Sequence, residues 1–244
     1  CSCVILNIIM STIINYLDKA DASTAVALNF DGGSIMDSMS EVFSSRLLWV
    51  PIALVFLYFL FKADAKNRQR LLIILAVALT VTLCDQLTSH VMKPYFARLR
   101  PSHTPGVENL LHYVNGYRGG QYGFCSSHAS NSFGVATFIT LMTRRMRIGF
   151  SFFALSLCVA YSRIYLGVHY FGDVFVGTAI GIAIGFLVFY MLPKNCRQIW
   201  LSRRVAQKRC ADMERLTSNG HRLRLPIFLR SAFYRTAKRR YINM

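Results

Sequence analysis

The chain has 244 residues, of which 54% are hydrophobic and only 16% carry a charge, and its mean hydropathy is +0.37. Soluble domains carry about 25% charged residues, so this chain is too apolar for that class, and it is too hydrophobic for intrinsic disorder. Seven scattered cysteines in a chain of this length exclude a disulfide-rich miniprotein. A polytopic membrane protein is the class that remains, provided that long apolar runs exist.

The N-terminal region is expected to hold a short helix. The run Val4 to Leu17 is apolar but brief, and it contains Asn7 and Asn15, so we predict an interfacial or short membrane helix there. A start at Cys1 is typical of a fragment or a processed product.

Five further apolar runs are each predicted to form a transmembrane helix, since a span takes roughly 17–25 mostly apolar residues. The runs are Leu47 to Phe61, Leu71 to Met92, Ala129 to Thr143, Ile148 to Tyr161 and Val174 to Leu192. The expected fold is therefore an all-α membrane bundle with five strong spans. Glycines 177, 181 and 185 in the last run either permit close helix contact or are merely tolerated in a membrane helix.

Lysine and arginine counts predict the orientation of this bundle. The linkers 62–70 and 144–147 are basic, and residues 194–244 hold 14 Lys and Arg against two acids, so these segments are expected in the cytoplasm. We predict that the basic tail attracts anionic lipid headgroups, and we expect no nucleic-acid binding. The predicted domains are 1–46, 47–193 and the tail 194–244. The loop 93–128 is expected outside although it holds four basic residues, an exception that favours an anionic ligand.

The first two candidate site segments flank that loop. Lys93 and Arg100 place two cations just after the second span, although basic caps are also common at helix ends. Ser126, Ser127 and His128 stand just before the third span, where hydroxyls and backbone N–H groups can hold an anion and a histidine can move a proton. A serine-rich helix cap with an incidental histidine is the simpler reading of that second segment.

The third segment lies in the next outward loop. Arg163 is another residue suited to phosphate, and His169 and Asp173 are four positions apart. A carboxylate on one imidazole nitrogen fixes the tautomer and makes the other nitrogen more nucleophilic. A histidine at the membrane interface beside a helix-capping acid is the alternative for this segment alone. Three such segments, in order and on one side, favour a functional site.

Together these residues resemble the three-part signature of the type 2 phosphatidic acid phosphatase (PAP2) superfamily, in which the pattern runs Lys-x6-Arg-Pro, Ser-x-His and Ser-Arg-x5-His-x3-Asp. The resemblance runs from about residue 18 to residue 192, and is greatest to bacterial inner-membrane phosphatases of undecaprenyl pyrophosphate and lipid A. The middle motif departs from the family's Pro-Ser-Gly-His, because it reads Cys125-Ser126-Ser127-His128. The added side chain at Ser127 puts the backbone geometry of the anion cradle in question.

The residues and the resemblance imply one mechanism. His169, oriented by Asp173, would attack phosphorus and form a phosphohistidine, while His128 would act as general acid and then as general base. The phosphate would be bound by five residues that carry cations or hydroxyls: Lys93, Arg100, Ser126, Ser127 and Arg163. No metal or other cofactor is expected, because side-chain cations supply the positive charge.

The expected function is an inner-membrane phosphatase with a periplasmic site and a cytoplasmic tail, acting on undecaprenyl pyrophosphate or lipid A. Phosphatidylglycerol phosphate and phosphatidic acid stay open as substrates, as does a non-catalytic lipid-binding or transport relative. Vanadate-dependent haloperoxidases share the signature but are soluble or peripheral, which five spans argue against. The loop 102–124, with several tyrosines, is either a lid over the headgroup or an interfacial anchor.

Overall fold

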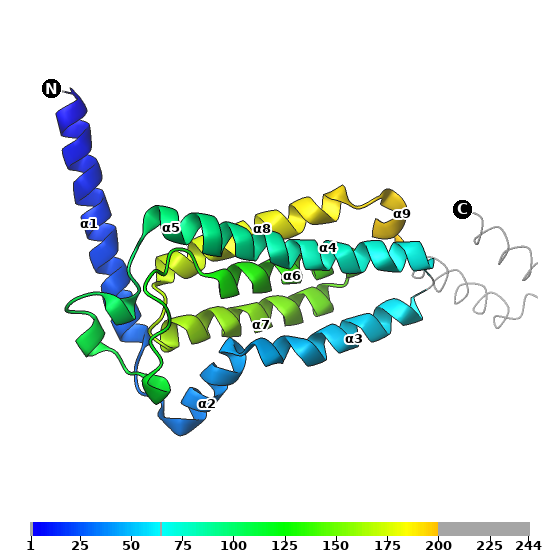
Figure 1. Cartoon of the computed structure of the whole chain (residues 1–244), viewed down its shortest axis with the longest axis horizontal. Helices are drawn as coiled ribbons and strands as arrows, with labels where there is room; N and C mark the ends of the chain where they lie inside the picture. The colour runs from blue at the N-terminus through cyan, green and yellow to red at the C-terminus, as the bar shows by residue number, and fades with distance from the viewer. Residues whose placement is uncertain (1, 64, 200–244) are drawn as a thin grey trace, which may run out of the picture. The chain divides into compact units, whose positions relative to one another are not determined.

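The computed structural model of the protein describes residues 2–63 and 65–199, and these residues form an all-helical bundle (Figure 1). The long helices are α1 (Ser2–Leu28), α2 (Gly33–Ser44), α3 (Trp49–Lys62), α4 (Asn67–Asp85), α6 (Ser127–Thr143), α7 (Met146–Tyr165) and α8 (Phe171–Met191). A π-helical segment (Gln86–Met92) and the short α5 (Lys93–Phe96) continue α4, and α9 (Lys194–Arg197) follows α8. The tail beyond residue 199 lies outside the described residues, so its predicted partner stays a prediction, as do the three predicted domains.

All five predicted spans are helical, but only three helices in the described ranges are individually long and apolar enough to cross a membrane. These are Asn67–Phe96, Met146–Tyr165 and Phe171–Met191. A fourth is added if α2 and α3, which meet at a bend of 52°, count as one broken span. The predicted membrane bundle is thus confirmed, whereas the number five stays a prediction. The helix α6 has 17 residues and most of them are buried, so its surroundings are protein more than lipid.

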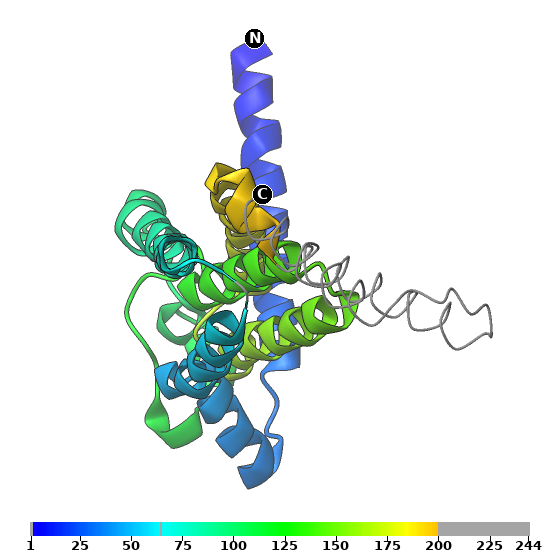
Figure 2. The ribbon, with the colours of Figure 1, turned by 90° about the vertical axis from the view of Figure 1, so that its right-hand side faces the viewer.

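The helix α6 is the centre of the bundle, and it packs against α4, α7 and α8. Figure 2 views the bundle end-on, with α6 in green among these three neighbours. A Cβ atom on Gly177 would lie 2.5 Å from the carbonyl oxygen of Ser126, and Gly181 and Gly185 press on the α6 backbone in the same way. The close-contact interpretation of these glycines is therefore confirmed, because any larger residue would separate α6 from α8.

The N-terminal helix is longer than the sequence predicted. It continues past Leu17 to Leu28, because its polar second half has partners outside the helix: Asp21 accepts the Gly172 N–H of α8 at 2.9 Å, and Asp18 and Asp21 bind Arg98. In Figures 1 and 2 α1 runs across the direction of the bundle helices. An interfacial helix would lie in this way, although the structure contains no membrane.

The helices alternate in direction, so the bundle has two chemically different ends. The turns from α3 to α4, from α6 to α7 and from α8 to α9 lie at one end, and they carry the basic linkers. The other end holds α2 and the long connection between α5 and α6. That connection folds back on itself, since the Gly123 N–H donates to the Arg98 carbonyl at 2.9 Å. It also covers the turn between α7 and α8, where the Ser102 N–H donates to the Gly167 carbonyl at 3.2 Å.

Candidate active site

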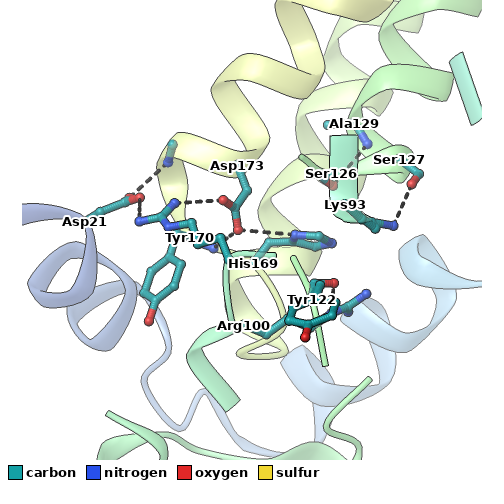
Figure 3. A network of polar contacts seen from close by, with 12 residues as sticks. Asp21, Lys93, Arg100, Tyr122, Ser126, Ser127, Ala129, His169, Tyr170 and Asp173 are labelled. Atoms are coloured by element: carbon teal, nitrogen blue, oxygen red, sulfur yellow. Dashed lines mark hydrogen bonds and ion pairs between the residues drawn. The ribbon is translucent and has the colours of Figure 1, made fainter. Parts of the chain in front are cut away.

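The three sequence motifs meet at the end of the bundle that holds the long connection (Figure 3). Lys93 begins α5, Ser126 caps α6 by accepting a hydrogen bond from the Ala129 N–H at 3.4 Å, and Asp173 lies in the first turn of α8. The predicted site residues therefore come from helix ends and from the loops beside them: Arg100 lies in the connection between α5 and α6, and His169 lies in the turn between α7 and α8. Backbone N–H groups in the first turn of a helix, such as the start of α6, can point at a ligand.

A tight turn places Arg163 and His169 on the same side of the bundle. The chain reverses after α7 through Gly167, whose φ of +66° is a conformation that favours glycine, and the Val168 N–H donates to the Arg163 carbonyl at 3.2 Å. Arg163 is 3% exposed and His169 is 1% exposed. An arginine this deeply buried needs a polar partner or an anionic ligand.

His169 faces Asp173, as the sequence predicted. His169 Nδ1 lies 3.5 Å from Asp173 Oδ2, and that same oxygen accepts the Tyr170 N–H at 3.0 Å. The Ser126 N–H donates to the Asp173 backbone carbonyl at 3.0 Å, which ties the start of α6 to the start of α8. The contact from Nδ1 to the carboxylate is longer than a hydrogen bond, and Nδ1 has no hydrogen-bond partner among the described residues, while the ring also interacts with the Gly123 backbone. Because Nδ1 is directed at the carboxylate, we assign the chemistry to Nε2.

The three predicted phosphate-binding cations all have neutral partners. Lys93 Nζ donates to Ser127 Oγ at 2.9 Å, Arg100 Nε donates to the Tyr122 carbonyl at 3.0 Å, and Arg163 Nη1 donates to Ser44 Oγ. Arg163 Nε is buried and has no hydrogen-bond partner among the residues that the structure describes. Within residues 2–63 and 65–199, no carboxylate lies within 4.0 Å of any of these cations. The cluster therefore carries positive charge that an anion can balance.

This charge acts on His169. Burial lowers the pKa of His169 well below its usual value, and the nearby Arg100, Arg163 and Lys93 lower it further. Burial and Arg163 also lower the pKa of Arg100, although a guanidinium remains protonated near neutral pH. The free protein thus holds a neutral imidazole beside a set of cations, which is the protonation state that a nucleophile requires.

His128 occupies the second position of α6, one residue after Ser127. It is close enough to Arg163, His169 and Lys93 to interact with each of them electrostatically, and it also interacts with the backbone of Ser44. The structure thus brings both predicted histidines to one site. The roles assigned to them stay predictions.

The departure from the family pattern at Ser127 is accommodated by α4 and its continuation. Ser127 Oγ contacts Ser89 Oγ at 2.9 Å as well as the ammonium of Lys93. Ser89 and Lys93 lie within and just after the π-helical segment, whose wider turns change which residues face α6. The extra hydroxyl is therefore satisfied, and it holds the lysine.

Cys125, which replaces the family's proline, is buried, and burial raises its pKa to about 11. It is therefore a neutral thiol, consistent with a structural substitution. Among the described residues no group of three or more His, Cys, Asp or Glu side chains could hold a metal ion, and metal independence stays a prediction.

Sequence reasoning missed two groups of contacts at this site. Ser44 at the end of α2 binds Arg163 although it lies 119 positions away, and no sequence motif marks it. Arg98, noted only as one of several basic loop residues, binds both Asp173 and Asp21. No sequence pattern separates Arg98 from Arg100, because the carboxylates that bind Arg98 come from α1 and α8, far away in the chain.

The PAP2 superfamily model matches residues 70–197, which is more than half of the chain and includes all eight predicted site residues. The chain belongs to the PAP2 superfamily. It is 36% identical over 188 residues to a lipid A 4'-phosphatase of Porphyromonas gingivalis, covering 77% of this chain and 79% of that protein. It is 35% identical over 178 residues to a lipid A 4'-phosphatase of Bacteroides thetaiotaomicron, covering 72% and 79%.

A solved structure shares the fold. The transmembrane PAP2-type phosphatidylglycerolphosphate phosphatase of Bacillus subtilis matches with a TM-score of 0.53 and 21% identity, covering 71% of this chain and 85% of that chain. The prediction of a PAP2-type phosphatase with an all-helical membrane fold is thereby confirmed.

Proposed function

We propose that the protein is a membrane lipid phosphatase that removes the 4'-phosphate of lipid A through a phosphohistidine at His169. The observation that carries the chemistry is the buried, neutral His169, with Asp173 on one ring nitrogen and three carboxylate-free cations around it. The observation that favours this substrate is the similarity to two lipid A 4'-phosphatases over more than two thirds of the chain.

The first half of the reaction transfers the phosphoryl group to the protein. His169 Nε2 attacks phosphorus in line with the oxygen that joins the phosphate to the lipid, and the bond between phosphorus and that oxygen breaks. The negative charge of the bound phosphate favours the protonated form of His128, which then donates its proton to the departing oxygen, and that oxygen leaves as the lipid's hydroxyl group. Asp173 stabilises the positive charge that develops on the imidazole.

The second half returns the protein to its starting state. His128, now neutral, takes a proton from water as the water oxygen attacks phosphorus, and the bond from nitrogen to phosphorus breaks. Inorganic phosphate leaves, and His169 is again neutral. In both halves Lys93, Arg100 and Arg163 would stabilise the charge on the three equatorial oxygens, which is the main demand of phosphoryl transfer.

The proposed orientation places the site in the periplasm and the basic linkers in the cytoplasm. The site residues and the basic linkers lie at opposite ends of α4, α6, α7 and α8. Lys and Arg are retained on the cytoplasmic side of inner-membrane proteins, which supports this direction. With α3 and α6 included, the bundle would have five spans. An odd number of spans places the segment before α3 and the tail after α8 on opposite sides of the membrane, as this orientation requires.

Phosphate release by purified protein tests the proposal. Full-length protein in detergent micelles, with EDTA present, is given lipid A and, separately, undecaprenyl pyrophosphate, which stays a predicted alternative substrate. We expect release from lipid A and loss of the 4'-phosphate in the product. The variant His169→Ala should lose at least about 10⁴-fold in rate, as expected when a nucleophile is removed.

Two controls separate chemistry from folding. His90→Ala removes an exposed histidine of the π-helical segment and should keep the wild-type rate. Denaturing gels of protein quenched with radiolabelled substrate should show a label that is stable to alkali and labile to acid in wild type and absent in His169→Ala. Release from undecaprenyl pyrophosphate alone would refute the substrate, and an unaltered rate in His169→Ala would refute the mechanism.

A further inference from the structure

We propose that Arg98, held by Asp21 of α1, is a positioning residue that keeps Asp173 ionised and aimed at His169. This inference rests on the proposed histidine mechanism but not on the identity of the lipid. It gives the N-terminal helix a part in the reaction that lies outside the three sequence motifs.

Arg98 is the direct partner of Asp173. Arg98 Nη1 lies 2.8 Å from Asp173 Oδ1, while the other carboxylate oxygen, Oδ2, faces His169 and the Tyr170 N–H (Figure 3). The two oxygens thus have separate tasks: one binds the guanidinium and the other is directed at the imidazole. Partners on both oxygens fix the plane of the carboxylate, because a charged hydrogen bond is short and directional.

Asp173 needs this cation. Its side chain is fully buried, and an ionised carboxylate without a charged partner is strongly destabilised in such a place. His169 is neutral in the free protein, so it cannot serve as the counter-ion. During the reaction the imidazole gains positive charge, and Asp173 can stabilise that charge only if it is already ionised.

Arg98 is itself held by the N-terminal helix. Arg98 Nη2 lies 2.8 Å from Asp21 Oδ2 and 2.9 Å from Asp18 Oδ1, and the guanidinium stacks on the Tyr170 ring at 4.3 Å. Asp21 Oδ1 also accepts the Gly172 N–H at 2.9 Å, so Asp21 binds the start of α8 directly. A negative charge at a helix N-terminus is favourable, which makes this a stable docking point.

The carboxylates also determine the charge of Arg98. Burial disfavours the guanidinium, but Asp173 and Asp21 outweigh burial and raise the pKa of Arg98. The charged or titratable groups that face Asp173 are Arg98, Arg100, Cys125, His169 and Tyr170, with Asp21 and Asp18 behind Arg98. Of these, Arg98 is the cation in contact with the carboxylate.

The test uses full-length protein and the soluble probe para-nitrophenyl phosphate, so that a wrong lipid assignment does not affect it. Arg98→Ala should lower kcat by about 10- to 100-fold, the range found when an outer partner of a working histidine is removed, with KM changed far less. Asp173 would then hold its proton to higher pH, so the acid limb of the kcat profile should move to higher pH. Arg98→Lys keeps the positive charge but lacks the planar set of N–H donors that binds two carboxylates at once, so it should retain part of the rate that Arg98→Ala loses.

Asp21→Asn keeps an acceptor for the Gly172 N–H but removes one of the two α1 charges that hold Arg98, and it should lower kcat less than Arg98→Ala does, because Asp18 remains. Glu108→Gln, which breaks the 3.7 Å contact with Arg118 in the outer loop, is the matched control and should keep the wild-type rate. If Arg98→Ala folds and keeps kcat within threefold with an unmoved pH profile, the proposal is wrong. If Arg98→Ala does not fold, an Asp21→Asn variant with unchanged kcat and pH profile overturns it in the same way.

Discussion

Arg98 and Arg100 are two residues apart in the same loop, yet their surroundings are opposite. Arg98 lies within 2.9 Å of three carboxylates, from Asp18, Asp21 and Asp173. Arg100 is held by the Tyr122 carbonyl and faces Arg163, another cation. The difference teaches how to tell an arginine that positions another protein group from one that binds a ligand: the charge of the first is balanced by carboxylates of the protein, and the charge of the second is not.

The site as a whole follows this division. On one side a chain of ion pairs runs from α1 through Arg98 to Asp173. On the other side the partners of Lys93, Arg100 and Arg163 in the described ranges are neutral groups: hydroxyls, a carbonyl and the Tyr117 ring. His169 lies between the two sides, with one ring nitrogen toward the carboxylate. We call the side with Arg98 and its carboxylates the balanced side, and the side with Lys93, Arg100 and Arg163 the unbalanced side. An anion with two charges near neutral pH, such as a phosphate monoester, would offset the positive charge of the unbalanced side.

For the comparison of the two arginines, the largest expected effect comes from exchanging each of them for alanine in turn. Arg100→Ala should lower kcat/KM by about 10²–10³-fold, as for removal of one donor to a transition-state oxyanion, and should abolish inhibition by inorganic vanadate. Its thermal stability should stay level or rise, because a repulsion between Arg100 and Arg163 is removed. Arg98→Ala should do the reverse: keep vanadate inhibition and lose about 1–3 kcal/mol of stability, since charged hydrogen bonds are broken.

Equal losses of stability in the two variants would contradict the division into balanced and unbalanced charge. The measurements are the melting temperature in detergent and the vanadate concentration for half inhibition, each compared with wild type at the same salt concentration. Salt matters because exposed charges are screened while buried ones are affected much less.

The starts of α6 and α8 are joined by the hydrogen bond from Ser126 to Asp173, so a substitution that pushes these two helices apart should disturb the site. Gly181→Leu would drive a side chain into the backbone at Ser130, and overpacking of this kind lowers stability by about 1–3 kcal/mol or more. The hydrogen bond from Ser126 to Asp173 should lengthen, and activity should fall with stability. Gly120→Leu, at a position with open space around it, should change neither the melting temperature nor the rate.

The unbalanced side of the site was predictable from sequence, and the balanced side was not. A set of five charged or titratable residues stands at the ends of apolar runs, and together on one predicted side they indicate a site, although each alone could be a helix cap: Lys93, Arg100, His128, Arg163 and His169. Their spacing also matches a known signature. Arg98 has the same composition signal, but its partner Asp21 lies 77 positions earlier on a helix that the sequence predicted to be shorter.

The fold was predictable to a similar degree. All five apolar runs are helices, because composition alone reports burial in lipid or protein. The number of helices that cross the membrane is harder to predict from sequence, since α6 is largely surrounded by protein and α3 has only 14 residues. Contacts such as Ser44 with Arg163 depend on the bend between α2 and α3, which no residue pattern in that segment marks.

The protonation state of His169 gives a smaller, pH-dependent effect. Its pKa is well below 6.5 in the folded protein, while the unfolded chain binds a proton near pH 6.5. As the pH falls through that value, the unfolded state gains protons that the folded state does not, so stability should decline by up to about 1.4 kcal/mol per pH unit. His169→Gln should reduce the difference in melting temperature between about pH 7.5 and about pH 5.5.

An identical dependence of melting temperature on pH in wild type and His169→Gln would mean that His169 has the same pKa in the folded protein as in the unfolded chain. In that case the cations on the unbalanced side do not act on the imidazole as the geometry indicates. Vanadate must be absent from this measurement, because a bound anion would neutralise those cations and raise the pKa of His169.

The smallest effect is expected at Ser127, where the sequence departs from its family. Ser127→Gly removes a neutral partner of Lys93 and of Ser89 but leaves the lysine's charge in place. One such hydrogen bond is worth about 1 kcal/mol, so kcat/KM should fall by less than about tenfold. Ser89→Ala, which leaves the contact from Lys93 to Ser127 intact, should have still less effect. A loss of more than about 100-fold in Ser127→Gly would instead mean that this hydroxyl contacts the phosphate itself. Ser127 and Lys93 would then bind the phosphate together, which the glycine of the family motif cannot do because it has no side chain.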